Sequence, residues 1–119
     1  MSDASAQPDP RQAYIEGIAP AFRPLFDRID RLTRTLHPEA IAGIAYAMPT
    51  YWVGKRRLHV GVWKHGVSLY GWKSDRPAAF LAHHPDLMTS TGTIRLTPED
   101  AAALSDDEIR EVIASALGT

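Results

Sequence analysis

An alternation of aliphatic and other residues across two neighbouring segments, 58–63 and 67–72, constrains the fold more than any other feature. In the first segment Leu58, Val60 and Val62 occupy every second position, and the second segment repeats the pattern from Val67. A period of two places the aliphatic side chains on one face of a β-strand. Glycine-containing turns, 54–57 and 64–66, bound the first segment. The pattern predicts an antiparallel meander, since glycine permits tight hairpin turns.

Aromatic residues fall on the face opposite the aliphatic one. Trp63, Tyr70 and Trp72 share this face, near His59 and His65. An aromatic sheet face is either covered by helices as a core or left open to bind a flat or apolar ligand. The sequence leaves both alternatives open.

Helices are predicted at both ends of the chain. Apolar residues follow steps of three and four from Tyr14 to Leu36, which is the helical period, and Pro20 divides this stretch into helices 11–19 and 20–36. Near the other end, Ser105 and Glu108 form a capping box, and the helix that they open ends at Gly118. Between these parts we expect a short helix over 75–84, a strand over 91–96 at a sheet edge, and a helical turn at 97–100.

These elements predict an α+β fold in two layers. An antiparallel sheet of about five strands carries the N-terminal and C-terminal helices on one face. The chain has 119 residues, which suits one domain over residues 11–119 after a disordered tail at 1–10.

Composition excludes several classes of function. The net charge is −1, so no general attraction to nucleic acid is expected, and the absence of cysteine excludes disulfides and thiolate chemistry. No stretch is apolar enough for a signal peptide or a membrane span, so a cytoplasmic location is expected. The sequence does not determine whether the chain is a monomer or a dimer.

Few residues carry an independent chemical signal. The chain has no phosphate-binding glycine loop and no nucleophile elbow, and its histidines lack the spacing of a zinc chelate. Acidic residues gather near the C-terminus and are candidate metal ligands, although acids in a first helical turn also serve as caps: Asp106, Asp107, Glu108 and Glu111. No catalytic set emerges, which favours a binding protein over an enzyme.

Several segments together resemble a known family. They are Tyr-Ala-Met-Pro-Thr-Tyr at 46–51, Gly-Lys at 54–55, Lys-His-Gly-Val-Ser-Leu-Tyr at 64–70 and Thr-Gly-Thr-Ile-Arg-Leu at 91–96. In order and wording they resemble the domain of unknown function 1801. The resemblance covers about residues 12–117 and implies a compact YdhG-like α+β fold, similar to frataxin.

The resemblance implies two functions. In the first, the motif residues line a pocket on the sheet that binds a small molecule or anion, such as a carboxylate or phosphate, through Tyr46, Met48, Thr50, His65, Tyr70 and Arg95. In a purely structural alternative, Tyr46 and Tyr70 are core residues and Arg95 pairs with an acid such as Asp107. The alternative function is a frataxin-like iron chaperone for haem or iron–sulfur assembly, with iron as the only cofactor considered. Four arginines on the first long helix, against Asp27 and Asp30, depart from the acidic ridge that such a role implies.

Overall fold

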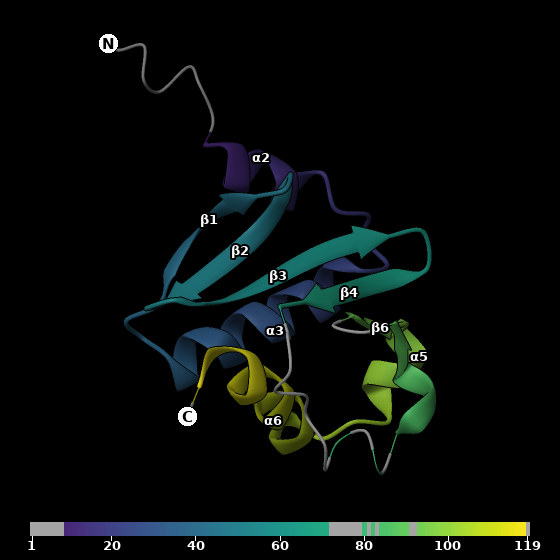
Figure 1. Cartoon of the computed structure of the whole chain (residues 1–119). Coiled ribbons are helices and arrows are strands. Elements are labelled where there is room, and N and C mark those ends of the chain that lie inside the picture. Colours follow the sequence, from purple (N-terminus) through teal and green to yellow (C-terminus); the bar gives the residue numbers. More distant parts are fainter. Residues whose placement is uncertain (1–8, 72–79, 81, 83, 91–92, 119) are drawn as a thin grey trace, which may run out of the picture.

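A computed structural model describes residues 9–71, 80, 82, 84–90 and 93–118 (Figure 1). The elements follow one another as α2 (Pro10–Glu16), α3 (Arg23–Leu36), β1 (Ile41–Ala45), β2 (Met48–Val53), β3 (Arg56–Trp63), β4 (Gly66–Tyr70), the 3₁₀ helix η1 (Pro85–Leu87), β5 (Met88–Ser90), β6 (Thr93–Leu96), α5 (Pro98–Ala102) and α6 (Asp106–Leu117). Most of the helix predicted over 75–84 and the tail over 1–8 lie outside the described residues. Pro10, which was predicted to belong to the tail, begins α2.

The strands form one six-stranded sheet in the order β1-β2-β3-β4-β6-β5, and every neighbouring pair is antiparallel. The prediction that residues 91–96 form an edge strand is wrong, because β6 lies between β4 and β5. The three-residue strand β5 occupies the edge instead. Such a short strand has no alternation long enough to be recognised in a sequence.

The aliphatic face of the sheet forms the core. Strand pairing aligns Tyr51 with Leu58, Val60 with Leu69, and Leu69 with Ile94, all of them at most 1% exposed. The apolar faces of α3 and α6 belong to the same core cluster, and α3 runs behind β3 in Figure 1. The predicted two-layer α+β fold is therefore confirmed, and the aromatic face is not the face that these helices cover.

Helix boundaries follow their capping residues. The predicted capping box at Ser105 and Glu108 is present at the start of α6, and Thr97 caps α5 in the same way. The helix predicted from Pro20 begins later, at Arg23, with Pro24 in its first turn. A proline in a first turn removes no intrahelical hydrogen bond, whereas one further inside would.

The chain reverses between β1 and β2 at Tyr46 and Ala47, whose φ angles are 53° and 61°. Met48-Pro49 does not bend the chain, because Pro49 lies inside β2, where it pairs with Ile44. Two consecutive positive φ angles match the twist of a tight hairpin, which usually employs asparagine or glycine. Residues with a Cβ pay about 1–3 kcal/mol each for this conformation, so the surrounding structure holds the turn.

Among the residues that the structure describes, no helix combines the length and the apolar character needed to span a membrane.

Candidate functional site

The second face of the sheet, opposite the core, gathers polar and aromatic residues of four strands, β2, β3, β4 and β6. Strand pairing places Thr50 beside His59 and His59 beside Tyr70, and it places Gly61 beside Ser68 and Ser68 beside Arg95. Alternation adds Met48 and Trp63 to the same face. Four of the six predicted ligand residues therefore share this face: Met48, Thr50, Tyr70 and Arg95.

His59 is the centre of one cluster on the second face, and Tyr46, a fifth predicted residue, contacts it. The Tyr46 ring meets the His59 ring edge to face, with centroids 5.3 Å apart. Thr50 Oγ1 lies 2.8 Å from His59 Nδ1 and donates to the Met48 carbonyl at 3.1 Å. Because a hydroxyl has one proton, Thr50 accepts from His59 Nδ1–H, which leaves the lone pair on Nε2.

The charge state of His59 follows from its surroundings. Burial, and secondarily the charge of Arg57, lowers the pKa of His59 below its ordinary value. The imidazole is therefore neutral near pH 7. Its Nε2 can accept a hydrogen bond or a proton from a bound molecule.

Arg95 and Trp63 form a second cluster with His65, the sixth predicted residue. The Arg95 guanidinium lies 4.9 Å from the centroid of the Trp63 ring, and His65 meets that ring at 5.1 Å and 89°. Arg95 is exposed and makes no ion pair with a carboxylate of the described residues. The structural alternative paired Arg95 with Asp107, but Asp107 lies 2.7 Å from Arg110.

Ser68, on the strand beside Arg95, has a side-chain hydroxyl that makes no hydrogen bond to the described residues. The residue is 1% exposed, and its Oγ has no hydrogen-bond partner among the residues that the structure describes. An unpaired buried hydroxyl costs about 1–3 kcal/mol. Buried polar groups without a partner therefore call for a structural or functional explanation.

Met48 separates the two clusters. A Cβ placed on Gly61 would lie 2.7 Å from Met48 Sδ and 3.7 Å from the Tyr70 ring, so the thioether packs on the bare backbone of Gly61. Four of the six predicted residues thus lie on this face, and Tyr46 and His65 contact it from adjoining turns, with the flexible side chain of Met48 between the two clusters. Methionine adapts readily to a changed neighbour.

A groove of about 420 Å³ lies between α2 and the end of β3, and none of the six predicted residues lines it. Its walls are mostly apolar and include Tyr14, Ile18, Phe22 and Trp63. The Tyr14 hydroxyl accepts a hydrogen bond from the Val62 amide at 2.8 Å, which satisfies a strand group at this end of β3. Trp63 therefore contributes to both the groove and the Arg95 cluster.

Three of the four acids predicted as metal ligands are paired with basic residues. Asp106 lies 2.8 Å from Arg28, Asp107 lies near Arg110, and Glu108 lies 2.7 Å from His84. The hydrogen bond from Arg28 lowers the pKa of Asp106, and the one from His84 lowers the pKa of Glu108. Glu111 is exposed, and no three His, Asp or Glu side chains of the described chain converge as a metal site. The structure therefore does not bring these four acids together around an ion.

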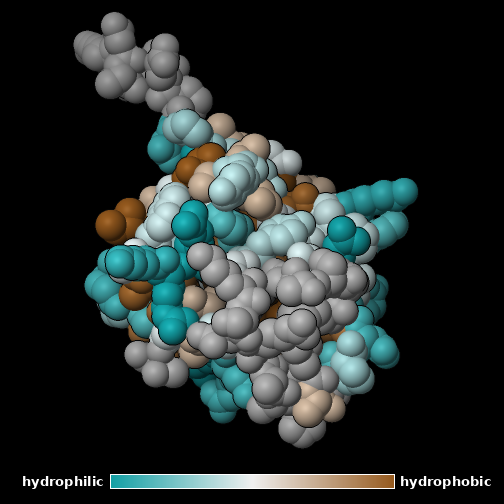
Figure 2. All heavy atoms as spheres, viewed as in Figure 1, coloured by the Kyte–Doolittle hydropathy of each residue, from teal (hydrophilic) through white to brown (hydrophobic). Residues whose placement is uncertain are grey.

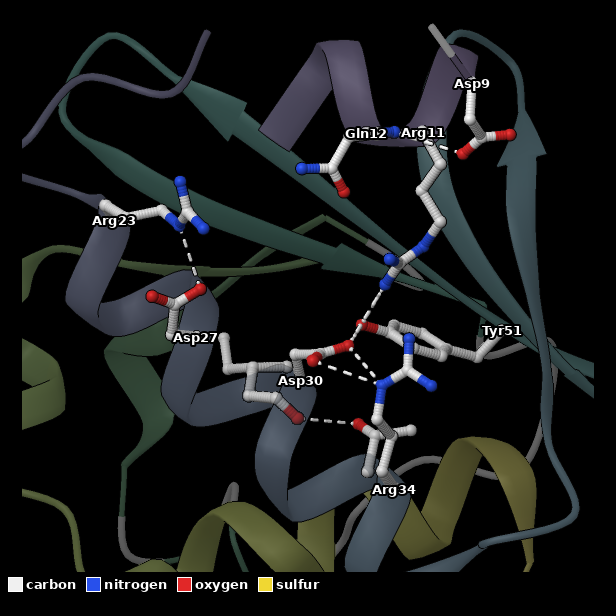
Figure 3. Close-up of polar contacts among 10 residues, drawn as sticks. Asp9, Arg11, Gln12, Arg23, Asp27, Asp30, Arg34 and Tyr51 are labelled. Atoms are coloured by element: carbon white, nitrogen blue, oxygen red, sulfur yellow. Dashed lines mark hydrogen bonds and ion pairs between the residues drawn. The ribbon is translucent and has the colours of Figure 1, made fainter. Parts of the chain in front are cut away.

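A further polar cluster joins α2, α3 and β2 on the core side of the sheet (Figure 3). Asp30 Oδ1 accepts from Arg11 at 3.0 Å, from Arg34 at 3.1 Å and from the Tyr51 hydroxyl, and Arg11 also donates to that hydroxyl at 2.9 Å. Burial, followed by the hydrogen bond to Asp30, raises the pKa of Tyr51 far above its ordinary value. The phenol stays protonated, so this cluster fastens α2 and α3 to the sheet and supplies no nucleophile.

Tyr51 follows Thr50 in β2 but does not share its face. Adjacent residues of a strand point to opposite faces, so Tyr51 belongs to the core, where it is 1% exposed. The alternation in the sequence had already placed Trp63 and Tyr70 on one face near His59, and the same parity adds Ser68. Sequence reasoning left His59, Ser68 and Trp63 out of the site.

The chain matches no protein-family model, no curated protein and no solved structure. The resemblance to the domain of unknown function 1801 therefore stays a prediction.

Proposed function

We propose that this chain binds a small molecule with a carboxylate or phosphate group at Arg95 on the second face of the sheet. One observation carries the proposal. An exposed guanidinium is held against an aromatic ring, without a carboxylate partner in the described part of the chain, beside a buried hydroxyl that has no partner. Arginines that only stabilise a fold usually donate their N–H groups to acceptors of the protein. Arg28, for example, donates to Asp106 and to the carbonyls of Ala101 and Leu104.

The chemistry of the cluster suits an anion with two oxygens. A guanidinium presents planar donors that match a carboxylate or phosphate in a two-pronged contact. Stacking on Trp63 restricts the orientation of Arg95 and so reduces the entropy lost on binding. Ser68, beside Arg95 on the neighbouring strand β4, adds a buried hydroxyl to the same part of the face.

His59 lies at the other end of the face and suits a different part of the ligand. It is on β3, two strands from β6, so about 10 Å separate it from the Arg95 position at the usual spacing of strands. Its neutral Nε2 accepts a hydrogen bond from a hydroxyl or amide. The ligand then crosses Met48, whose thioether shifts to admit it.

A thermal-shift screen tests this proposal. Inorganic phosphate, phosphate monoesters and small carboxylates are compared with chloride at equal ionic strength, which removes general screening. We expect at least one anion class to raise the melting temperature of wild type and of Arg57→Gln, a matched variant on the same face, but not of Arg95→Gln. Equal shifts in all three proteins, or no shift with any anion, would refute the proposal.

The iron-binding alternative has no comparable observation behind it, because three of its four acids are paired with Arg28, Arg110 and His84.

A further inference from the structure

Strand β1 forms one edge of the sheet and lacks the features that protect an edge strand. Its five residues, Ile-Ala-Gly-Ile-Ala, contain no charge and no proline, and in the described chain β1 pairs with β2 alone. Natural edge strands usually carry lysine, proline or a bulge, because unpaired amides and carbonyls attract another strand. An unprotected edge of this composition is suited to pairing.

An exposed hydrophobic residue begins the same edge. Ile41 is the first residue of β1 and is 69% exposed. The other large hydrophobic side chain that lies exposed among the described residues, Tyr46, contacts His59 of β3 and so lies away from this edge. Figure 2 shows hydrophobic atoms at the surface on the β1 side of the molecule. Apolar surface is therefore concentrated where strand hydrogen bonds are also unused.

Gly43, at the middle of β1, lies under the ring of Trp52. A Cβ at Gly43 would lie 3.1 Å from Cζ3 of that ring, so the indole crosses the strand on the second face where no side chain stands. Trp52 is half-buried and reaches toward the open edge. An apolar ring is thereby presented at the midpoint of the strand.

We propose that β1 pairs antiparallel with β1 of a second copy, about a twofold axis at Gly43. In this register Ile41 of one copy faces Ala45 of the other, and Ala42 faces Ile44, so every pair is apolar. A twofold axis requires a surface that is complementary to itself. The two Trp52 rings meet above the pair of glycines, at the axis. Because neither β1 nor β2 carries a charge, pairing places no like charges together.

The contact is small, so the dimer is weak and reversible. Five residues per copy add one strand pair to the sheet, at the lower end of the sizes of specific interfaces. The main chain supplies most of the hydrogen bonds, as when a peptide adds to a sheet edge. We expect the dissociation constant of the dimer to lie in the micromolar range. This inference does not rest on the proposed anion site.

Sedimentation over a range from low-micromolar to millimolar protein tests the proposal, together with hydrogen exchange at the β1 amides. We expect a monomer–dimer equilibrium that Ile41→Lys weakens at least tenfold. Ile41 is exposed, so this variant keeps its fold, which circular dichroism verifies. Ala103→Lys, at an exposed helix end, is the matched control and leaves the equilibrium unchanged.

Trp52 supplies an independent signal. We expect its near-ultraviolet circular dichroism to change with protein concentration and the change to vanish in Trp52→Phe. A protein that stays monomeric at every concentration overturns the proposal. So does a dimer that Ile41→Lys does not weaken, because another surface then forms it. Protection of the outward β1 amides in the monomer also overturns it, because another part of the same chain then covers the edge.

Discussion

Replacing Tyr51 with phenylalanine removes one hydroxyl from the cluster that joins α2, α3 and β2. The hydroxyl donates to Asp30 and accepts from Arg11 at 2.9 Å, and the residue is 1% exposed. Hydrogen bonds to charged groups contribute about 1.5–3 kcal/mol each, but Arg11 and Arg34 still hold Asp30 in the variant. We therefore expect the free energy of unfolding to fall by about 2 kcal/mol in Tyr51→Phe, mostly through the lost bond to Asp30.

Urea and thermal unfolding measure this loss. For a chain of this size, about 2 kcal/mol corresponds to a fall of about 8 °C in the melting temperature. Tyr70→Phe is the matched control, because the Tyr70 hydroxyl makes no hydrogen bond to the described residues, and its effect should stay within about 0.5 kcal/mol. A Tyr51→Phe variant as stable as this control would refute the assignment of Tyr51 as the fastener of the two helices.

The stability difference between wild type and Tyr51→Phe should also depend on pH in the alkaline range. Burial and Asp30 raise the pKa of Tyr51 in the folded protein, while the unfolded chain ionises at about pH 10. Above that pH the unfolded state loses a proton that the folded state keeps, so wild type loses stability. The advantage of wild type over Tyr51→Phe should shrink by about 1.4 kcal/mol per pH unit above about pH 10. An advantage that stays constant with pH would contradict the buried, protonated phenol.

Two further predictions concern the second face and the core. The pKa of His59 is lower in the folded protein than in the unfolded chain. As the pH falls below about 6.5, the unfolded state therefore binds a proton that the folded state does not bind, and the free energy of unfolding falls. His59→Gln should reduce the loss of stability between about pH 8 and about pH 5 in urea unfolding, and an unchanged pH profile would oppose a buried neutral imidazole. A Cβ at Gly66 would lie 2.0 Å from the Leu96 carbonyl oxygen, which is backbone, so Gly66→Ala should cost about 3 kcal/mol or prevent folding. Gly61→Ala meets only the flexible Met48 side chain and should cost about 1 kcal/mol, and equal losses in the two variants would contradict this comparison.

Local patterns predicted much of the fold. The alternation from Leu58 to Leu69 correctly assigned the central hairpin and separated its aliphatic from its aromatic face, although it left open which face the helices cover. The capping box at Ser105 correctly located α6. These features depend on neighbours in sequence. Local patterns did not indicate the turn at Tyr46 that reverses the chain. Pro49 is tolerated inside β2 because it pairs with Ile44 of β1, whereas the pairing of β2 with β3 begins only at Thr50.

The candidate site could be predicted only in part, because its contacts join distant residues. Parity along each strand places Thr50 and Tyr70 on one face, but nothing local indicates that Arg95 stacks on Trp63 from two strands away. The partners of charges are equally nonlocal. Arg28 pairs with Asp106 across 78 positions, and this pairing occupies one of the acids that the sequence offered as metal ligands.

The measurement closest to the central claim is the NMR signal of arginine side-chain Nε–H groups during titration with inorganic phosphate and with acetate. An anion bound at the second face accepts hydrogen bonds from Arg95 through its oxygens and leaves Arg57 on the same face untouched. We predict a saturable shift of the Arg95 signal, absent for Arg57, with at least one of the two anions. An unmoved Arg95 signal, or equal and unsaturable shifts of every arginine, would contradict anion binding at this site.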